Sequence, residues 1–290
     1  MVNVLKDIKI LESVFKSDSK SYGNIIFPIS AGAVLYGKDD IVLQMRDDTG
    51  DNISNKNPFY CELTVQYWGW KNLKCDVCGI FHQRRFLDLS ERNKKYPYTI
   101  AERADEATLE NACLNYGRLC ELTDRYGIIA NRREDLYESV EDFYNRNDRH
   151  QFDDIGLLKD IIKEKYPEYH PSAQKYFKGT CSYFCNVFIM QKKQFDDYSR
   201  WMFDILFEYE KRKPKNLFYP REIGKLGERL FGVYMTYIMD NTDISYTEFP
   251  RIHFSDVNGT TMKNLSFNKY LYHICPPGTK RRAFLRKLKK

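Results

Sequence analysis

The stretch DVCGIFHQRRF, residues 76–86, decides the fold expected of this chain. The apolar run at 77–81 is typical of a buried strand, and it leads directly into His82, Arg84 and Arg85. In open α/β sheets, ligands bind just beyond the carboxyl ends of the strands. A strand that ends in an imidazole and guanidinium groups therefore predicts an α/β sheet with an anion-binding edge.

Strand and helix signals alternate on both sides of this stretch. The expected elements are a strand at 8–11, a helix that begins with Asn57 as cap and Pro58 at its first position, a helical pattern over 99–127, and strands at 127–130 and 183–190. We predict an α/β half at 1–133 and a largely helical half at 134–279. Together they are expected to form a single domain, followed by a basic tail at 280–290.

Length and composition favour a globular protein. The chain has 290 residues, of which 42% are hydrophobic and 15% aromatic, enough to bury a large core. The sequence lacks both a long uninterrupted apolar run and a signal-peptide pattern, so a cytoplasmic location is expected. Eight cysteines spread over this length favour reduced thiols rather than a disulfide framework.

The net charge of +6 is concentrated at the C-terminal end. Positions 280–290 hold seven basic residues and no acidic one, which leaves the preceding residues with a net charge of −1. A nucleic-acid-binding domain spreads its positive charge over a folded face, so no nucleic-acid partner is expected. A basic tail with Phe284, Leu285 and Leu288 near helical spacing suits the anionic inner face of a membrane, and a solvated terminus is the alternative.

An acidic loop precedes the strand. Asp47, Asp48 and Asp51 lie close together around Gly50, with Asn52 beside them. Carboxylates at this spacing hold divalent cations, orient hydroxyl groups or act as bases, and the same residue types also form ordinary turns.

The helix after this loop combines aromatic rings with polar groups. It carries Glu62, Trp68, Lys71 and Asn72, a combination that binds sugars and bases, although the spacing also fits an aromatic core helix. Because the loop, the helix and the strand end follow one another in sequence, we expect all three at one edge of the sheet.

Neither a cysteine metal site nor a glycine-rich nucleotide-binding motif is well supported by the sequence. The thiols of Cys75 and Cys78 would point to opposite faces of a strand, so they predict a metal site only if a turn replaces the strand. The glycine motifs that bind dinucleotides or the phosphates of P-loop enzymes are missing from the sequence, which argues against both of those enzyme classes.

The helix expected at 222–240 carries an unusual carboxylate. At about 100° per residue, Glu228 falls beside Phe231 and two methionines, away from the polar stripe that holds Arg229. A carboxylate on an apolar face is costly unless it is paired or protonated, and such groups are enriched in active sites. An internal ion pair with Arg221 or Arg229 is the structural alternative.

The segments RDDTGDNISNKNPFYCELTVQYWGWKNL, at 46–73, and DVCGIFHQRRF resemble a bacterial family found in capsular and exopolysaccharide gene clusters. Members of that family, long labelled as being of unknown function, are regarded as glycosyltransferases, and some are galactofuranosyltransferases. The similarity extends from about residue 21 to about residue 252 and includes GERLF at 227–231. Two departures stand out: the first strand lacks a following histidine, and Gln83 replaces a tyrosine.

The resemblance implies a glycosyltransferase with a Rossmann-like, GT-A-like core. Its donor would be a nucleotide-diphosphate sugar such as a UDP-sugar, and its acceptor a glycan or a lipid-linked oligosaccharide. We expect Glu228 to be the catalytic base or a transition-state stabiliser, with Asp48 and His82 as further catalytic residues. The remaining substrate contacts are expected at Asp47, Asp51, Asn52, Glu62, Trp68, Lys71, Asn72, Arg84, Arg85, His150 and Asn186.

Whether a metal cofactor is expected depends on which groups neutralise the charge of the leaving diphosphate. Arg84 and Arg85 can grip a phosphate with their guanidinium groups, so a divalent metal such as Mn or Mg is not favoured. Two other functions fit the same residues. The first is a sugar-phosphate transferase with metals in the acidic loop, and the second is a non-catalytic glycan-binding partner in a polysaccharide assembly complex.

Overall fold

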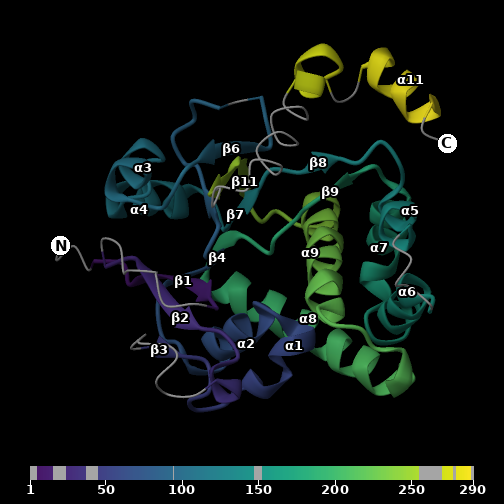
Figure 1. Ribbon diagram of the computed structural model, residues 1–290, viewed down its shortest axis with the longest axis horizontal. Helices are drawn as coiled ribbons and strands as arrows, with labels where there is room; N and C mark the ends of the chain where they lie inside the picture. The colour runs from purple at the N-terminus through teal and green to yellow at the C-terminus, as the bar shows by residue number, and fades with distance from the viewer. Residues whose placement is uncertain are drawn as a thin grey trace.

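The computed structural model describes residues 5–15, 24–36, 45–93, 95–146, 152–254, 270–276 and 279–288. A central sheet lies between groups of helices (Figure 1). Its strands are β1 (Ile8–Val14), β2 (Ile26–Ser30), β3 (Met45–Arg46), β4 (Val77–His82), β5 (Arg85–Leu87), β6 (Tyr98–Ala101), β7 (Ile128–Asn131), β10 (Phe188–Gln191), β11 (Tyr246–Phe249) and β12 (Arg251–Phe254). The predicted α/β fold is therefore confirmed.

The sheet combines parallel and antiparallel pairs. Its order is β11-β7-β10-β4-β1-β2-β3, and β12 joins β5 to β6. The strands β3, β2, β1 and β4 are parallel, whereas β10 is antiparallel to both β4 and β7. A separate small sheet pairs β8 (Glu134–Asp135) with β9 (Cys181–Ser182). Strands from both sides of residue 134 thus share one sheet, and the division into two halves stays a prediction.

Helices cover both faces of the sheet. They are α1 (Asn57–Tyr60), α2 (Leu63–Asn72), α3 (Glu106–Asn111), α4 (Tyr116–Arg125), α5 (Val140–Asn145), α6 (Asp154–Lys165), α7 (His170–Lys178), α8 (Lys192–Arg212), α9 (Glu222–Asn241) and α11 (Lys280–Leu288). Short 3-10 turns are η1 (Ala33–Leu35), η2 (Ser54–Lys56), η3 (Pro167–Tyr169) and η4 (Lys215–Leu217). Cys78 and Ile80 of β4 face the core of α2, α8 and α9, while Val77 and Phe81 face the core of α4.

Several elements differ from those expected from sequence. The helix at Asn57 is interrupted at Cys61, whose φ of 52° ends α1, and Asn57 lies inside the helix because Lys56 is its cap. The helical pattern over 99–127 contains β6 and two helices, because Asp105 and Asn115 each cap a new helix start. The strands β11 and β12 were not expected, because each four-residue segment holds two polar or charged residues and lacks a continuous apolar run.

A buried ion cluster connects the ends of α6, α8 and α9. Lys213 Nζ lies 2.6 Å from Asp154 Oδ1 and 2.7 Å from Glu222 Oε1, and all three side chains are almost fully buried. Tyr209 donates its hydroxyl to both carboxylates, at 2.5 Å and 2.6 Å. This cluster fixes the start of α9 against α6 and α8.

The C-terminal helix α11 is attached to the body through one of its basic residues. Arg282 is 1% exposed, its guanidinium lies 3.8 Å from the ring centroid of Tyr137, and its Nε lies 3.7 Å from Asp135. Phe284 is 61% exposed. One of the seven tail charges thus has a structural role, and contact of the tail with a membrane stays a prediction. In the described ranges, no helix has the length and apolar character needed to cross a bilayer.

We expect Lys213→Met to lower the free energy of unfolding by about 3–5 kcal/mol, because it leaves two buried carboxylates without their cation. Urea denaturation measures this loss. The matched control is Lys211→Met, since Lys211 is 78% exposed and lies 3.7 Å from Glu208. Equal stability of the two variants would show that the buried cluster contributes nothing to folding.

Candidate active site

The end of β4 and the start of α2 bring an imidazole and a carboxylate together. His82 is the last residue of β4, and its Nε2 lies 3.3 Å from Oε2 of Glu62, which immediately precedes α2. Only 5% of the Glu62 side chain is exposed. This contact lies at the carboxyl edge of the sheet, where ligands bind in open α/β folds.

Glycines in α9 let this helix approach Glu62 closely. A Cβ atom on Gly224 would lie 3.2 Å from Cβ of Cys61, and one on Gly227 would lie 2.8 Å from Cδ1 of Leu63. Larger residues would therefore push α9 away from the start of α2. Glu228 follows Gly227 in α9, and its carboxylate is close enough to that of Glu62 for the two charges to interact.

The dipeptide Cys185–Asn186 bonds to both carboxylates. The backbone N–H of Cys185 donates to Glu228 Oε1 at 2.8 Å, and the Asn186 side-chain amide donates to Glu62 Oε1 at 2.7 Å. Both residues have left-handed backbones, with φ of 72° and 43°. Strain of this kind costs about 1–3 kcal/mol per residue and is concentrated at functional sites.

The surroundings of the two carboxylates drive their pKa values apart. Burial raises the pKa of Glu62, but His82 and the Asn186 amide outweigh it, so the net shift is below the ordinary value. Burial raises the pKa of Glu228, and the charge of Glu62 adds to this effect against the opposing Arg229. Divergent carboxyl groups of this kind are found where one must stay ionised and the other must exchange a proton.

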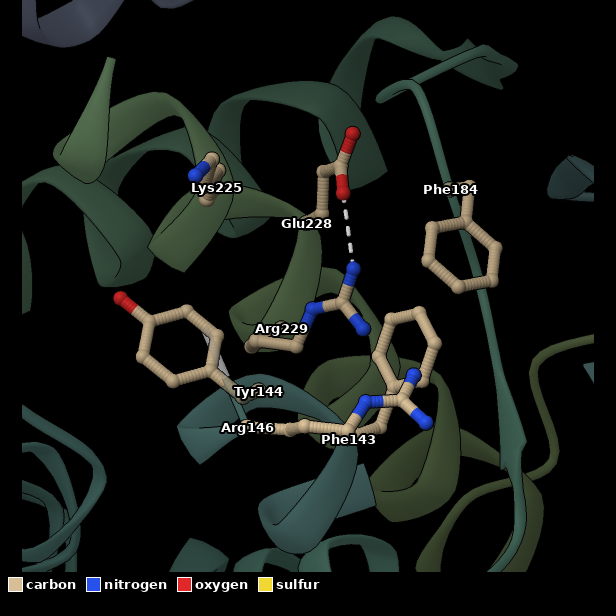
Figure 2. Close-up of a pocket in the computed structure, with 7 residues that line it drawn as sticks. All are labelled: Phe143, Tyr144, Arg146, Phe184, Lys225, Glu228 and Arg229. Carbon is tan, nitrogen blue, oxygen red and sulfur yellow. Dashed lines mark hydrogen bonds and ion pairs between the residues drawn. The ribbon is translucent and has the colours of Figure 1, made fainter. Parts of the chain in front are cut away.

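Glu228 also lines a cavity of about 350 Å³ between α5, α9 and the segment after β9. Phe143, Tyr144, Arg146, Phe184, Lys225 and Arg229 form the remaining walls (Figure 2). Arg229 donates to Glu228 Oε2 at 2.7 Å and to Ser182 at 2.8 Å. The sequence pattern placed Arg229 on the polar stripe, but it is 3% exposed because it pairs with Glu228.

Two guanidinium groups lie at the thiol of Cys185, whose backbone N–H bonds to Glu228. Arg251 donates to Cys185 Sγ at 3.1 Å, and Arg85 hydrogen-bonds the same sulfur. Burial, together with the charge of Arg85, lowers the pKa of Arg251 to about 9. Burial and these two cations lower the pKa of His253, the partner of Arg85 in the β5–β12 pair, to about 2, so His253 is neutral. Arg84, on the β4–β5 turn, is exposed.

The acidic loop uses its carboxylates to shape the chain. Asp47 is fully buried and accepts hydrogen bonds from the N–H groups of Gly32 and Ala33 and from the Ser54 hydroxyl, at 2.8, 2.9 and 2.6 Å. Asp48 pairs with Arg46 through bonds of 2.7 Å and 3.1 Å. These carboxylates already have partners within the chain.

Asp51 and Asn52 bond to their own surroundings as well. Asp51 accepts from the Tyr67 hydroxyl at 3.0 Å, and its backbone N–H and C=O bond to the side chain of Asn72. The Asn52 side chain bonds to Gly50 O and to Ser54 N. The loop is therefore fastened to α2.

The far end of α2 points away from the carboxylate pair. At 1.5 Å per residue, Asn72 lies about 15 Å along the helix from Glu62, and α2 leads into the opposite end of β4. Trp68 donates to Thr49 at 2.9 Å, and the Lys71 ammonium lies 3.6 Å from the ring centroid of Trp70. Only the start of α2 therefore lies at the sheet edge with His82, because a helix of ten residues extends along the sheet.

Of the other expected site residues, His150 lies outside the described residues. The structure brings together Glu62, His82, Arg85, Asn186 and Glu228. It places Asp47, Asp48, Asp51, Asn52, Trp68, Lys71 and Asn72 in the acidic loop and along α2, away from this group. Within the part of the chain that the structure describes, His, Cys, Asp and Glu side chains do not converge in threes as metal ligands do. The eight cysteines are free thiols.

Comparison with known proteins identifies the family of this chain. The family model described as a domain of unknown function, DUF4422, matches residues 9–240. The chain belongs to the DUF4422 family. Within the described residues, both carboxylates and the Cys185–Asn186 dipeptide lie inside the matched DUF4422 region.

A solved structure shares the fold of this DUF4422 chain. The apo structure of WbbM, a bifunctional glycosyltransferase, aligns with a TM-score of 0.80 and 30% sequence identity over 86% of this chain. The alignment covers 46% of WbbM, so the chain spans about half the length of that protein. Among curated proteins, no significant match is found.

Sequence reasoning missed three contributors to this DUF4422 site: Cys185, Arg251 and His253. It named Arg229 as a possible ion-pair partner of Glu228, and the structure contains that pair. Arg251 and His253 alternate with buried apolar residues in β12, and this period-2 pattern was the available signal. The left-handed backbone of Cys185 has no sequence signal, because left-handed turns are usually marked by glycine or asparagine.

We expect Glu62→Gln and Glu228→Gln to change stability with opposite pH dependence. Because the pKa of Glu62 is lowered, its ionised form stabilises the fold above pH 4.5, which is the ordinary pKa of a glutamate. This contribution is lost as the pH falls through the pKa of Glu62 in the folded protein. Because the pKa of Glu228 is raised, its protonated form stabilises the fold below pH 4.5. This contribution is lost as the pH rises through the pKa of Glu228 in the folded protein.

Relative to Glu62→Gln, the wild type should therefore lose stability in acid below pH 4.5. Relative to Glu228→Gln, it should lose stability as pH rises from 4.5 toward neutrality. Urea unfolding of all three proteins over this range measures both slopes. Parallel slopes for the two variants would contradict the divergent ionisation of the pair.

Proposed function

We propose that this chain is a glycosyltransferase that uses a nucleotide-diphosphate sugar as donor. One observation carries the proposal: a carboxylate with a raised pKa lies beside an ionised carboxylate and buried guanidinium groups, at the carboxyl edge of the sheet. The shared fold with WbbM, a glycosyltransferase, supports the same reaction class. The resemblance of residues 46–86 to proteins of capsular gene clusters supports a surface polysaccharide as product and galactose or galactofuranose as the transferred sugar.

The leaving nucleoside diphosphate needs positive charge as its bond to the sugar breaks. Arg85 hydrogen-bonds the sulfur of Cys185, and Arg84 is exposed on the adjacent turn. Guanidinium groups bind phosphate oxygens through paired hydrogen bonds, so these residues can stabilise the departing diphosphate without a proton transfer. We propose that they replace a divalent metal in this role.

The acceptor hydroxyl must lose a proton as it attacks the sugar. Glu228 faces a cavity, retains 18% exposure of its side chain, and has a raised pKa, which suits a general base near neutral pH. Glu62 stays ionised and holds His82 at the end of β4, where the carboxylate of Glu62 can stabilise positive charge that develops on the donor sugar. The proton then passes from the acceptor hydroxyl to Glu228.

The rival functions have less support from the geometry. A sugar-phosphate transferase would use the acidic loop for metal ions, but Asp47 and Asp48 are bonded to groups of this chain. A glycan-binding partner without activity would not need a buried carboxylate with a raised pKa, which is costly to maintain.

We expect Glu228→Gln to lower the turnover of the folded protein at least about a hundredfold, because a general base contributes about 10²–10⁴ in rate. Measured on a panel of nucleotide sugars, the wild-type kcat should fall on the acid side, with its midpoint above 4.5. Glu168→Gln, at an exposed position, is the control and should keep wild-type turnover. Near-normal turnover of folded Glu228→Gln removes Glu228 from catalysis.

We expect Arg84→Ala and Arg85→Ala each to weaken donor binding about tenfold or more, because each removes a charge-assisted bond to the diphosphate. Isothermal titration with UDP and with UDP-sugars measures the effect, and Arg103→Ala, at an 81% exposed side chain, is the control. Unchanged donor affinity in both variants would refute the assignment. Turnover should also persist in EDTA, and complete loss that manganese restores would contradict the proposal that the guanidinium groups replace a metal.

A further inference from the structure

Cys75 and Cys78 lie beside each other at the start of β4. The strand begins at Val77, so Cys75 belongs to the segment between α2 and β4, where the alternation of a strand does not apply. The Cys78 thiol hydrogen-bonds the Cys75 sulfur. The sequence predicts convergence of these side chains only if a turn replaces the strand, and the start of the strand after Cys75 has the same effect.

Metal binding does not account for this pair of thiols. A structural zinc site needs four ligands, of which Cys75 and Cys78 would supply two. Among the described residues, no further histidine, cysteine, aspartate or glutamate joins them to form a group of three. Two adjacent thiols with no further ligand have one other common chemistry, which is the formation of a disulfide.

The two thiols differ in their access to solvent. Cys78 is fully buried in the core formed with α2, α8 and α9. Cys75 is partly exposed and lines a cavity of about 510 Å³ together with Lys6, Asp76 and Lys192. A small solute can therefore reach the Cys75 sulfur, whereas Cys78 is shielded behind it.

The pKa values of the two thiols differ in the same sense. The hydrogen bond with Cys78 holds the pKa of the Cys75 thiol below its ordinary value, against the effect of burial. The charges of Lys192 and Lys9 also lower this pKa, and the charge of Asp7 opposes them. Burial raises the pKa of the Cys78 thiol well above its ordinary value. Since the thiolate is the nucleophilic form, Cys75 is the thiol that attacks an oxidant, and Cys78 stays protonated beside it.

We propose that Cys75 and Cys78 form a reversible disulfide when the protein meets hydrogen peroxide. In the first step the Cys75 thiolate attacks one peroxide oxygen, the O–O bond breaks, and hydroxide leaves, which converts Cys75 to a sulfenic acid. In the second step the Cys78 sulfur attacks the Cys75 sulfur, the S–O bond breaks, and the oxygen departs as water with the thiol proton of Cys78. The two thiols are oxidised, the peroxide is reduced to hydroxide and water, and a dithiol reductant reverses the change.

The neighbouring thiol also limits further oxidation of Cys75. A sulfenic acid that finds no thiol is oxidised onward to a sulfinic acid, which dithiol reductants do not restore. Because Cys78 already contacts Cys75, the disulfide forms before a second peroxide molecule arrives. The pair lies at the opposite end of β4 from His82, so this chemistry is separate from the proposed function.

Mass spectrometry of the wild-type chain tests this inference. Trypsin cuts after Lys74 and Arg84, so both cysteines lie in one peptide, 75–84, whereas Cys113 is the only cysteine in the peptide 104–118. After peroxide treatment and blocking of free thiols with iodoacetamide, the peptide 75–84 should carry no alkyl group and be lighter by two hydrogen atoms than the unblocked dithiol peptide. Treatment with dithiothreitol before blocking should return it to the doubly alkylated form.

Cys113 is partly exposed as well and is the internal control. It should remain open to alkylation at the peroxide concentration that closes the pair. Full alkylation of the peptide 75–84 after peroxide, or a sulfinic acid at Cys75 without the disulfide, overturns the inference. Oxidation of Cys113 as fast as the pair also overturns it, since the reactivity would then be general and not a property of this site.

The variant Cys78→Ala isolates the first step. Its Cys75 sulfenic acid should persist long enough for dimedone to trap it, and the disulfide should be lost completely. The matched variant Cys113→Ala should keep the disulfide. Equal trapping in the wild type and in Cys78→Ala would contradict the role of Cys78, and if Cys78→Ala does not fold, the wild-type peptide still decides the question.

Discussion

The buried carboxylate of Glu62 is the constraint on which the site depends. Removing a charge from water is expensive unless polar partners surround it, so Glu62 requires both His82 and Asn186 within bonding distance. These partners come from the end of β4 and from the segment before β10, which are far apart in sequence. The carboxylate thus couples three segments, and none of them can move without exposing or orphaning a charge.

This coupling explains why the backbone around Glu62 is unusual. Cys61, Cys185, Asn186 and Arg221 all have positive φ values, and all lie beside one of the two carboxylates or beside its immediate neighbour. Ordinary strand and helix ends would aim the N–H of Cys185 and the amide of Asn186 elsewhere. The fold tolerates the local strain because the surrounding sheet and α9 hold these segments in place.

The sequence predicts the features of this structure that depend on neighbouring residues better than those that depend on contacts between distant segments. The strand at β4, the helix at α9 and the unusual position of Glu228 could be inferred from local periodicity. Local periodicity could not show that Asp47 binds backbone N–H groups of Gly32 and Ala33, because a buried carboxylate and a solvated one have the same sequence signature. Likewise, the inward turn of Arg229 depends on Ser182, a partner that only the folded chain provides, in addition to the neighbouring Glu228.

The order of the strands has a consequence for how the chain folds. The strand β4 lies between β1, which is made before it, and β10, which begins at Phe188, more than a hundred residues after His82. At typical synthesis rates of about 5–20 residues per second, one edge of β4 waits about 5–20 s for its neighbour. During this time the apolar run before His82 is an unpaired edge that can join the wrong strand. The nascent chain is therefore most exposed to aggregation before β10 emerges, and folding is slowed by pairing across long loops.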